Sequence, residues 1–246
     1  MKNELLANEK EKLETHLRMV AETSESLARK ITRGDTKFAE LAYLAGSLHD
    51  IGKALTIYQA RKIGYLSHEV VSGITATEVC RSLEYSEKDS YVVVHAVLYH
   101  MQGYGLIHER FSQFKKYFFT RKVKLSYDPR AATALMKILS EKWSLDEDEV
   151  SNILNRSVSE LDKLLKLGRN IVHCILSRVR GELSLTDLYE DISTLHKARI
   201  LTGIVMVSDK WVSVVNRKGR GTSLYFKCVR QLFEGLNIVG TLKFNN

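Results

Sequence analysis

The sequence predicts an all-α protein organised as a single helical bundle, and two observations support this fold class. Only one proline and 14 glycines occur among 246 residues, so few residues interrupt helices. Leu, Ala, Lys and Glu recur throughout, a composition that favours long helices over a sheet with many turns. A chain of this length can also bury a substantial core.

The first two predicted helices carry apolar stripes. Residues 4–32 place Leu13 and Leu17 among apolar residues three and four positions apart, which is the spacing of one helix face. The pattern stops at Gly34, a suitable C-terminal cap. A second apolar helix is expected over about 36–49.

Capping residues mark the next two helices. Ser67 opens the third, where its hydroxyl can cap free amides of the first turn. Ser86 and Asp89 have the spacing of a capping box and open a segment that runs through His100. Three consecutive valines, residues 92–94, weaken the helical preference of this segment.

Beyond this point the apolar pattern changes twice. Residues 106–127 break it, and 128–180 return to it as two or three helices. A further helix is expected within 184–216, and the basic turn 217–221 leads to a last helix near 224–236.

These patterns predict one domain over residues 1–246, without a linker or an internal repeat. Its core is expected to consist of about 1–105 and 184–246, and about 106–183 to form a helical insertion or lid.

Cysteine usage and hydropathy indicate a cytoplasmic protein that does not span a membrane. Cys80, Cys174 and Cys228 are odd in number and far apart, which suggests neither a disulfide framework nor a thiolate zinc site. The N-terminal segment is charged rather than a signal sequence, and no apolar stretch approaches the roughly 20 residues of a membrane span.

The charge balance favours a polyanionic partner. Lys and Arg total 37 against 29 for Asp and Glu, which makes the formal net charge +8. Such a charge attracts nucleic acid through long-range attraction and counterion release. Charge alone is weak evidence, because many basic proteins bind no nucleic acid.

A His-Asp doublet is the main candidate for catalysis. His49 and Asp50 are followed by Gly52 and Lys53. Adjacent residues of a regular helix point about 100° apart, so both reach one metal ion most easily where the helix loosens, which Gly52 permits. Lys53 is placed to contact a phosphate, although a solvated lysine is the simpler interpretation.

Two further polar residues fall on apolar helix faces. His16 lies at the edge of the first helix's stripe, and Asp209 is in line with Val205 and Val212. A buried carboxylate is costly unless it is paired or binds metal. Asp209 therefore needs either a salt-bridge partner or a metal ion.

In this pattern the chain resembles the HD phosphohydrolase superfamily, whose ordered signature is a His, the His-Asp doublet, further His and a distant Asp. The residues that match in order are His16, His49, Asp50, His68, His100 and Asp209. The segments HDIGKA, SHEVVSG and YHMQGYG are most similar to the stand-alone HD nuclease of type I CRISPR interference, which works beside a separate helicase and a guide-RNA surveillance complex. The motifs cover roughly residues 10–105 and 195–215.

The resemblance implies two metal positions that share Asp50. A first ion would be held by His16, His49, Asp50 and Asp209. A second would be held by Asp50, His68 and the later histidines His95 and His100.

One departure from that nuclease family concerns the second position. The family commonly has two adjacent histidines where this chain has His100 and Met101. His95 or His108 could replace the missing ligand. His95 is about 140° from His100 around a helix, so a core histidine is the alternative interpretation.

His and carboxylate ligands together suit manganese, iron, cobalt or nickel, with magnesium possible at a carboxylate-rich position. Such ions would generate hydroxide from bound water and stabilise charge on the attacking and leaving oxygens. The catalytic residues are then expected to be His49, Asp50 and Lys53. The sequence has no GxxxxGK[ST] loop, so a helicase motor must lie on another polypeptide.

Residues 109–127 interleave cations with aromatic residues, a combination that single-strand binders use. The alternative is an amphipathic helix with core aromatics and solvated lysines. Together with the basic turn, the candidate nucleic-acid contacts are Lys115, Lys116, Arg121, Lys122, Arg217, Lys218 and Arg220.

Three functions are therefore considered. The first is a nuclease acting on DNA, expected to be single-stranded, in CRISPR interference. The second is an HD enzyme that hydrolyses nucleotides or other small phosphoesters. The third is a basic nucleic-acid-binding subunit with a degenerate site, which Met101 favours.

Overall fold

The computed structural model describes residues 4–8, 11–60, 65–101, 106–121, 124–166, 171–179, 192–216 and 224–236. These residues form helices and, apart from two isolated bridges, no β-structure, which confirms the predicted all-α class. The elements in chain order are α1 (Leu13–Ile31), α2 (Thr36–Leu48), the 3-10 helix η1 (Ile51–Ala54), α3 (Thr56–Gln59), α4 (His68–Ser82), α5 (Glu87–Tyr99), α6 (Ile107–Arg121), α7 (Arg130–Leu139), α8 (Glu147–Lys166), α9 (Ile171–Val179), α11 (Ile192–Asn216) and α12 (Leu224–Gly235).

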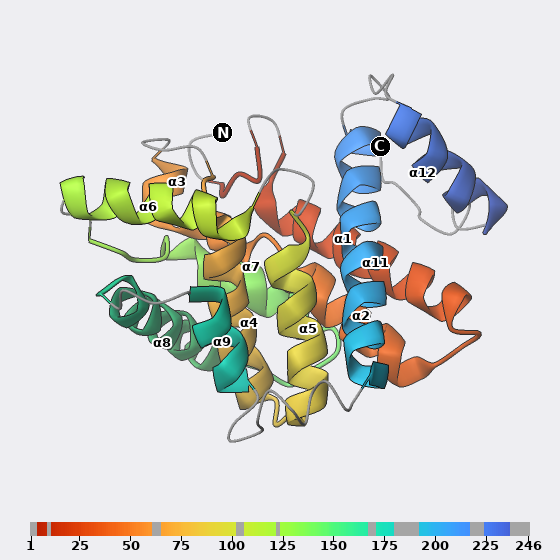
Figure 1. The fold of residues 1–246 in the computed structure, drawn as a ribbon, viewed down its shortest axis with the longest axis horizontal. Helices are drawn as coiled ribbons and strands as arrows, with labels where there is room; N and C mark the ends of the chain where they lie inside the picture. Colours follow the sequence, from red (N-terminus) through yellow and green to blue (C-terminus); the bar gives the residue numbers. More distant parts are fainter. Residues whose placement is uncertain are drawn as a thin grey trace.

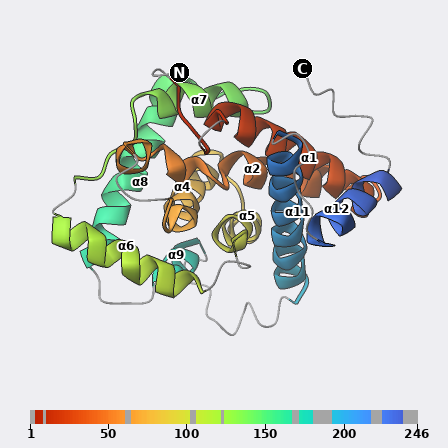
Figure 2. The ribbon, with the colours of Figure 1, turned by 90° about the horizontal axis from the view of Figure 1, so that it is seen from above.

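The helical hairpin of α4 and α5 occupies the middle of the bundle. Figure 2 shows both helices end-on, with α1, α2 and α7 on one side, α11 on a second side and α6, α8 and α9 on a third. Since the short turn between α4 and α5 makes them antiparallel, the first residue of α4 and the residue after α5 lie at the same end of the hairpin. These residues are His68 and His100.

The segment predicted as an insertion or lid packs on the bundle in its described parts. α7 contacts α1, and α8 contacts α4. Leu135 of α7 and Leu161 of α8 are fully buried in the same apolar cluster as the residues of α1, α2, α4 and α5. This cluster is the core that supports the polar site described below.

The first helix begins later than its periodicity predicts. α1 starts at Leu13 rather than near residue 4, because the preceding segment folds back on it. Leu13 N donates to Leu5 O at 2.8 Å, and Leu6 pairs with Lys12 in an isolated antiparallel bridge. Leu5 and Ala7 are buried, so packing rather than helix propensity determines this turn.

One predicted cap forms and another does not. Ser86 Oγ accepts from Asp89 N at 3.1 Å and begins α5 as expected. Ser67 precedes α4, but its φ is +59° and its side chain caps no amide. A left-handed residue turns its side chain away from the helix start, so this part of the prediction is wrong.

Two segments are helical despite unfavourable local signals. The three valines of α5 are almost fully buried between α4, α2 and α11, and packing there outweighs their β preference. The stretch after residue 106, which breaks the apolar rhythm, forms α6 because Phe111 and Phe114 are three residues apart and both bury against the core.

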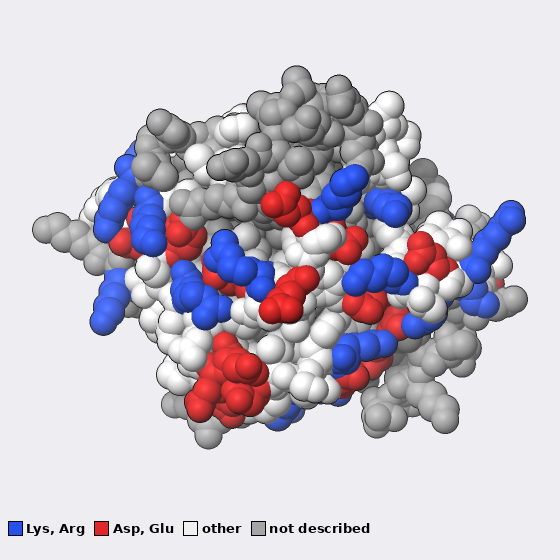
Figure 3. Space-filling model, turned by 90° about the horizontal axis from the view of Figure 1, so that it is seen from below, with Lys and Arg blue, Asp and Glu red and all other residues white. Residues whose placement is uncertain are grey.

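No helix in the described residues is both long and apolar enough to cross a membrane. On the face shown in Figure 3, the coloured basic and acidic side chains are interspersed. The net positive charge of the chain is therefore not gathered as a field of one sign on this face.

Candidate metal centre

The His-Asp doublet lies where α2 ends. His49 still has helical angles, whereas Asp50 has φ −116° and ψ 5° and leaves the helix before η1 begins. This change of direction at Asp50 lets two adjacent side chains reach the same site, as predicted. Gly52 was expected to loosen the helix, but the structure gives this glycine a different role.

Gly52 is required for a close approach between chain segments rather than for backbone freedom. A Cβ atom at this position would lie 2.2 Å from the carbonyl oxygen of His68 and 2.9 Å from Val71 Cβ. Gly52 N also donates to Ser72 Oγ at 2.9 Å. The glycine therefore brings η1 against the first turn of α4 and places Asp50 beside His68.

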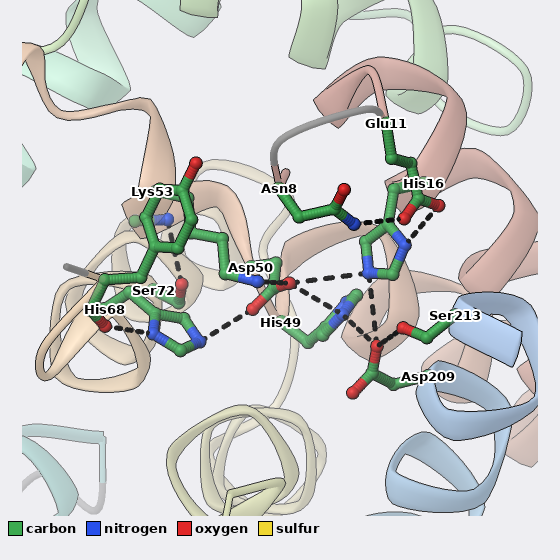
Figure 4. Close-up of polar contacts among 12 residues, drawn as sticks. Asn8, Glu11, His16, His49, Asp50, Lys53, His68, Ser72, Asp209 and Ser213 are labelled. Atoms are coloured by element: carbon green, nitrogen blue, oxygen red, sulfur yellow. Dashed lines mark hydrogen bonds and ion pairs between the residues drawn. The ribbon is translucent and has the colours of Figure 1, made fainter. Parts of the chain in front are cut away.

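Six residues form two groups of possible metal ligands, and one of them, Asp50, belongs to both groups. Their ligand atoms lie within 4.8 Å of one another inside each group. Figure 4 shows most of these side chains converging from α1, the doublet, α4 and α11. The first group is His16, His49, Asp50 and Asp209, and the second is Asp50, His68 and His100.

The candidate ligand atoms lie close together without satisfying one another's hydrogen bonds. His16 Nε2 lies 3.2 Å from Asp209 Oδ1, and His68 Nε2 lies 2.7 Å from Asp50 Oδ1. Even so, buried Asp50 Oδ1 and the Nε2 atoms of the histidines have no hydrogen bond. Buried polar atoms without partners are rare and costly, so this arrangement fits a divalent cation that each of them would contact. The histidines concerned are His16, His49, His68 and His100.

Each imidazole is oriented through its other nitrogen. Nδ1 of His49, His68 and His100 lies 2.6–2.7 Å from the carbonyl oxygen of the residue three positions earlier. Because Nδ1 donates its proton to this carbonyl, Nε2 keeps a lone pair directed into the site. His16 has a carboxylate partner, since its Nδ1 lies 2.8 Å from Glu11 Oε1.

The carboxylates of the site are held in their charged form. Burial opposes ionisation of Asp50, but Lys53, His49 and His68 outweigh it and keep its pKa well below the usual range. For Asp209 burial acts in the same direction, and contacts with His16 and His49 lower its pKa well below that of an exposed Asp.

The basic groups show the opposite shift. Burial disfavours charge on His16, yet the carboxylates of Asp209, Asp50 and Glu11 raise its pKa well above the usual value. Burial likewise disfavours charge on Lys53, and Asp50 and Asp209 raise its pKa. The site thus concentrates negative charge, which is the electrostatic environment that a divalent cation needs.

Lys53 lies at the edge of the centre. Its Nζ contacts Asp50 Oδ2 and lies 5.1 Å from the centroid of the Tyr65 ring. The side chain is only 15% exposed, so the solvated lysine considered from the sequence is not what is observed. The ammonium group is held in the site next to the carboxylate shared by both ligand groups.

Asp209 reaches the centre from α11, far along the chain. Its Oδ1 faces His16 and His49, and Ser213 Oγ is 3.3 Å away. Among the described residues its ion-pair partners are these two histidines, not the Lys or Arg of an ordinary salt bridge. The side chain is 26% exposed, so the site is reachable from solvent on this side.

The structure does not bring His95 to the metal ligands. Its Nδ1 lies 3.1 Å from Thr202 Oγ1 of α11, and its ring packs between Tyr91 and Tyr99. α5 is regular through Tyr99, so His95 and His100 point to different sides, and the ligand role expected for His95 is corrected.

His108, the other candidate replacement for the missing ligand, is likewise absent from both ligand groups. It lines a pocket of about 220 Å³ with His173, Tyr99 and three aliphatic residues. Met101 follows His100 as a partly buried residue.

The predicted nucleic-acid contacts are described only in part. Lys115 is partly buried with its Nζ 5.9 Å from the centroid of the Phe119 ring, and Lys116 is exposed, both on α6. Arg121 is the last residue of α6. The remaining predicted residues, Lys122, Arg217, Lys218 and Arg220, lie outside the described part of the chain.

A buried ion pair connects α6 to the centre. Arg110 Nε donates to Glu69 Oε1 at 2.9 Å, and Glu69 is 1% exposed and directly follows His68. Glu69 Oε2 is 3.6 Å from His68 Nδ1. Sequence analysis missed this pair, because nothing in the sequence indicates that residues 41 positions apart meet.

Glu11 and Asn8 were also missed. Figure 4 shows both side chains above His16, with Asn8 Nδ2 donating to Glu11 Oε2 at 2.7 Å. A carboxylate five residues before a candidate ligand and just outside the helix start is a weak signal. It becomes informative only because residues 5–7 pair with residues 11–13 before and at the start of α1.

Comparison with protein families identifies one match. The model described as HD domain matches residues 13–165, more than half of the chain. The match includes His16, His49, Asp50, His68 and His100, and Asp209 lies beyond it but joins the same site in the fold. Searches of curated proteins and of solved structures found no match.

Proposed function

Because the chain belongs to the HD domain family of metal-dependent phosphohydrolases, we propose that it is a nuclease that cleaves phosphodiesters of single-stranded DNA. We place this activity in type I CRISPR interference, beside a separate helicase and a guide-RNA surveillance complex. The observation that carries the hydrolase part is the buried set of unpaired imidazole nitrogens around Asp50.

The two ligand groups would hold one or two divalent ions, such as manganese, iron, cobalt, nickel or magnesium. When bound, such ions supply a nucleophilic hydroxide at neutral pH and charge stabilisation for an in-line displacement at phosphorus. Asp50, which belongs to both groups, holds the two positions close together.

Residues of the chain position the substrate around this centre. The ammonium group of Lys53 is held by Asp50 and presents a positive charge where a non-bridging phosphate oxygen would lie. His49 and His16 are fixed by hydrogen bonds through Nδ1 and present Nε2 without rearrangement. This preorganisation lowers the cost of ordering the site during reaction.

The preference for a nucleic acid over a small phosphoester rests on α6. Its ion pair with Glu69 attaches this helix next to His68, and the helix carries Lys115, Lys116 and the half-exposed ring of Phe119. Cations that follow the backbone and an aromatic ring that stacks on a base suit an extended single strand. The CRISPR subtype is supported by the segments HDIGKA, SHEVVSG and YHMQGYG.

A substrate panel tests this proposal. The purified protein is incubated with labelled single-stranded DNA, duplex DNA, single-stranded RNA and a set of nucleotides, with Mn²⁺ or with chelator. We expect metal-dependent cleavage of single-stranded DNA and no cleavage by Asp50→Asn. Turnover of nucleotides alone would favour the small-phosphoester alternative, and binding without any turnover would favour a degenerate site.

A further inference from the structure

One of the four histidine ligands differs from the other three in how it is held. His49, His68 and His100 donate through Nδ1 to backbone carbonyls. His16 donates through Nδ1 to the carboxylate of Glu11 at 2.8 Å. A carboxylate partner makes an imidazole a stronger electron donor than a neutral carbonyl does, because it stabilises positive charge on the ring.

Glu11 is itself placed by a chain of contacts. The side chain is 7% exposed, and its second oxygen accepts from Asn8 Nδ2 at 2.7 Å. With Oε1 facing His16 and Oε2 facing Asn8, the carboxylate is fixed in one orientation. Its charge therefore lies against the metal ligand and is little screened by solvent.

The turn that carries Glu11 and Asn8 is attached to the catalytic end of the bundle. Gln59 of α3 pairs through its amide with both backbone groups of Leu6 at 3.0 Å. The Tyr65 hydroxyl donates to Leu6 O at 3.2 Å. The segment before α1 thus contacts the same elements that position Lys53 and His68.

We propose that Glu11, oriented by Asn8, is a positioning residue that strengthens His16 as a ligand and makes the four-residue group the tighter of the two metal positions. The two groups differ because Glu11 hydrogen-bonds His16 Nδ1 at 2.8 Å. In the second group, Glu69 lies 3.6 Å from His68 Nδ1 and is paired with Arg110. This inference rests on the metal-binding role proposed above and is independent of the choice of DNA as substrate.

Direct metal titration tests the inference without an activity assay. Mn²⁺ binding is measured by calorimetry on the full chain, and the visible spectrum of the Co²⁺ form reports the ligand field. Glu11→Gln keeps an acceptor for Nδ1 and removes the charge, whereas Glu11→Ala removes both. Asn8→Ala frees the carboxylate to change orientation.

We expect Glu11→Gln to weaken the tighter position about tenfold to a hundredfold, with a changed Co²⁺ spectrum and an unchanged weaker position. Glu11→Ala should weaken it further, and Asn8→Ala less. The matched control is Glu14→Gln, which makes the same change of charge three residues later, in the first turn of α1, at a partly exposed residue paired with Arg18 and Lys137. This control should bind metal as the wild type does.

Metal binding by the Glu11 variants tests the role of Glu11, and metal binding by the wild-type protein tests the proposed function. Wild-type affinity and spectrum in both Glu11 variants would overturn it. A parallel loss at both positions, together with a lower melting temperature of the metal-free protein, would show that Glu11 only maintains the fold. If the wild-type protein itself bound no Mn²⁺ or Co²⁺, both the proposed function and this inference would fail.

Discussion

Asp50 Oδ1 lies 2.7 Å from His68 Nε2, yet no hydrogen bond joins these two atoms. Nδ1 of His68 donates its proton to the Tyr65 carbonyl, so Nε2 of the neutral imidazole carries no proton to share with Asp50. Nε2 and Oδ1 are therefore two electron-pair donors held close together in a buried place. A cation between them would remove the repulsion.

Loss of either member of the doublet should abolish hydrolysis. His49→Ala and Asp50→Asn each remove a ligand, and Asp50→Asn also removes the charge shared by both positions. We expect turnover to fall about a hundredfold or more, equivalent to about 3 kcal/mol of transition-state stabilisation. Circular dichroism should show unchanged helical content, and near-normal turnover in either variant would exclude the metal assignment.

Metal removal should lower thermal stability. A ligand that binds only the folded state, at a concentration of about 100 times its dissociation constant, raises the free energy of unfolding by about 2.7 kcal/mol. For a chain of this size that corresponds to a melting temperature higher by roughly 5–10 °C. Scanning calorimetry with Mn²⁺ and with chelator measures the difference. Asp50→Asn should show little metal-dependent shift, and an equal shift in this variant would place the metal elsewhere.

Gly52→Ala should destabilise the fold and disturb the metal centre together. The added methyl group meets the His68 carbonyl at 2.2 Å, so η1 and α4 must separate, at a cost of about 1–3 kcal/mol or more. Gly203→Ala is the matched control, because no atom lies within 4 Å of its added Cβ and α11 gains about 0.5–1 kcal/mol. Urea titration measures both changes, and equal stability of the two variants would contradict the close approach.

The second metal position should be the weaker one, and Met101→His should strengthen it. Among the residues that the structure describes, Asp50, His68 and His100 form that group, and a thioether is a poor ligand for harder divalent ions. We expect Met101→His to shift the metal dependence of activity to lower concentration. His95→Ala should leave that dependence unchanged, because His95 faces Thr202. A new demand for excess metal in His95→Ala would contradict its observed position.

Nucleic-acid affinity should fall steeply with salt, partly through α6. Each phosphate contact on a single strand contributes about 0.7 to the slope of log K against log salt. Lys115→Gln with Lys116→Gln should therefore flatten the slope by up to about 1.4. The control is Lys163→Gln with Lys166→Gln on α8, which makes the same change of charge in residues already paired with Glu160 and Asp162. Equal slopes in the two double variants would remove α6 from the binding surface.

Local sequence signals were sufficient for the helical class and for naming most of the residues that the fold brings together as possible ligands. The apolar period placed His16 on a buried helix face, and the side chain is 2% exposed in the structure. The doublet, followed by Gly52, indicated a place where the helix ends. These features depend on residues within one or two turns of each other, so a pattern in the sequence can reveal them.

Tertiary packing decided which of these side chains meet. The sequence alone determined that the chain is helical and that it carries histidines and aspartates in an order suited to metal. Only the packing of α11 and α5 decided that Asp209 joins His16 while His95 turns to Thr202. Likewise, only the folded-back turn before α1 decided that Glu11 meets His16. The physical reason is that periodicity assigns a side chain to a helix face, whereas which faces meet depends on how distant helices bury their apolar surface together.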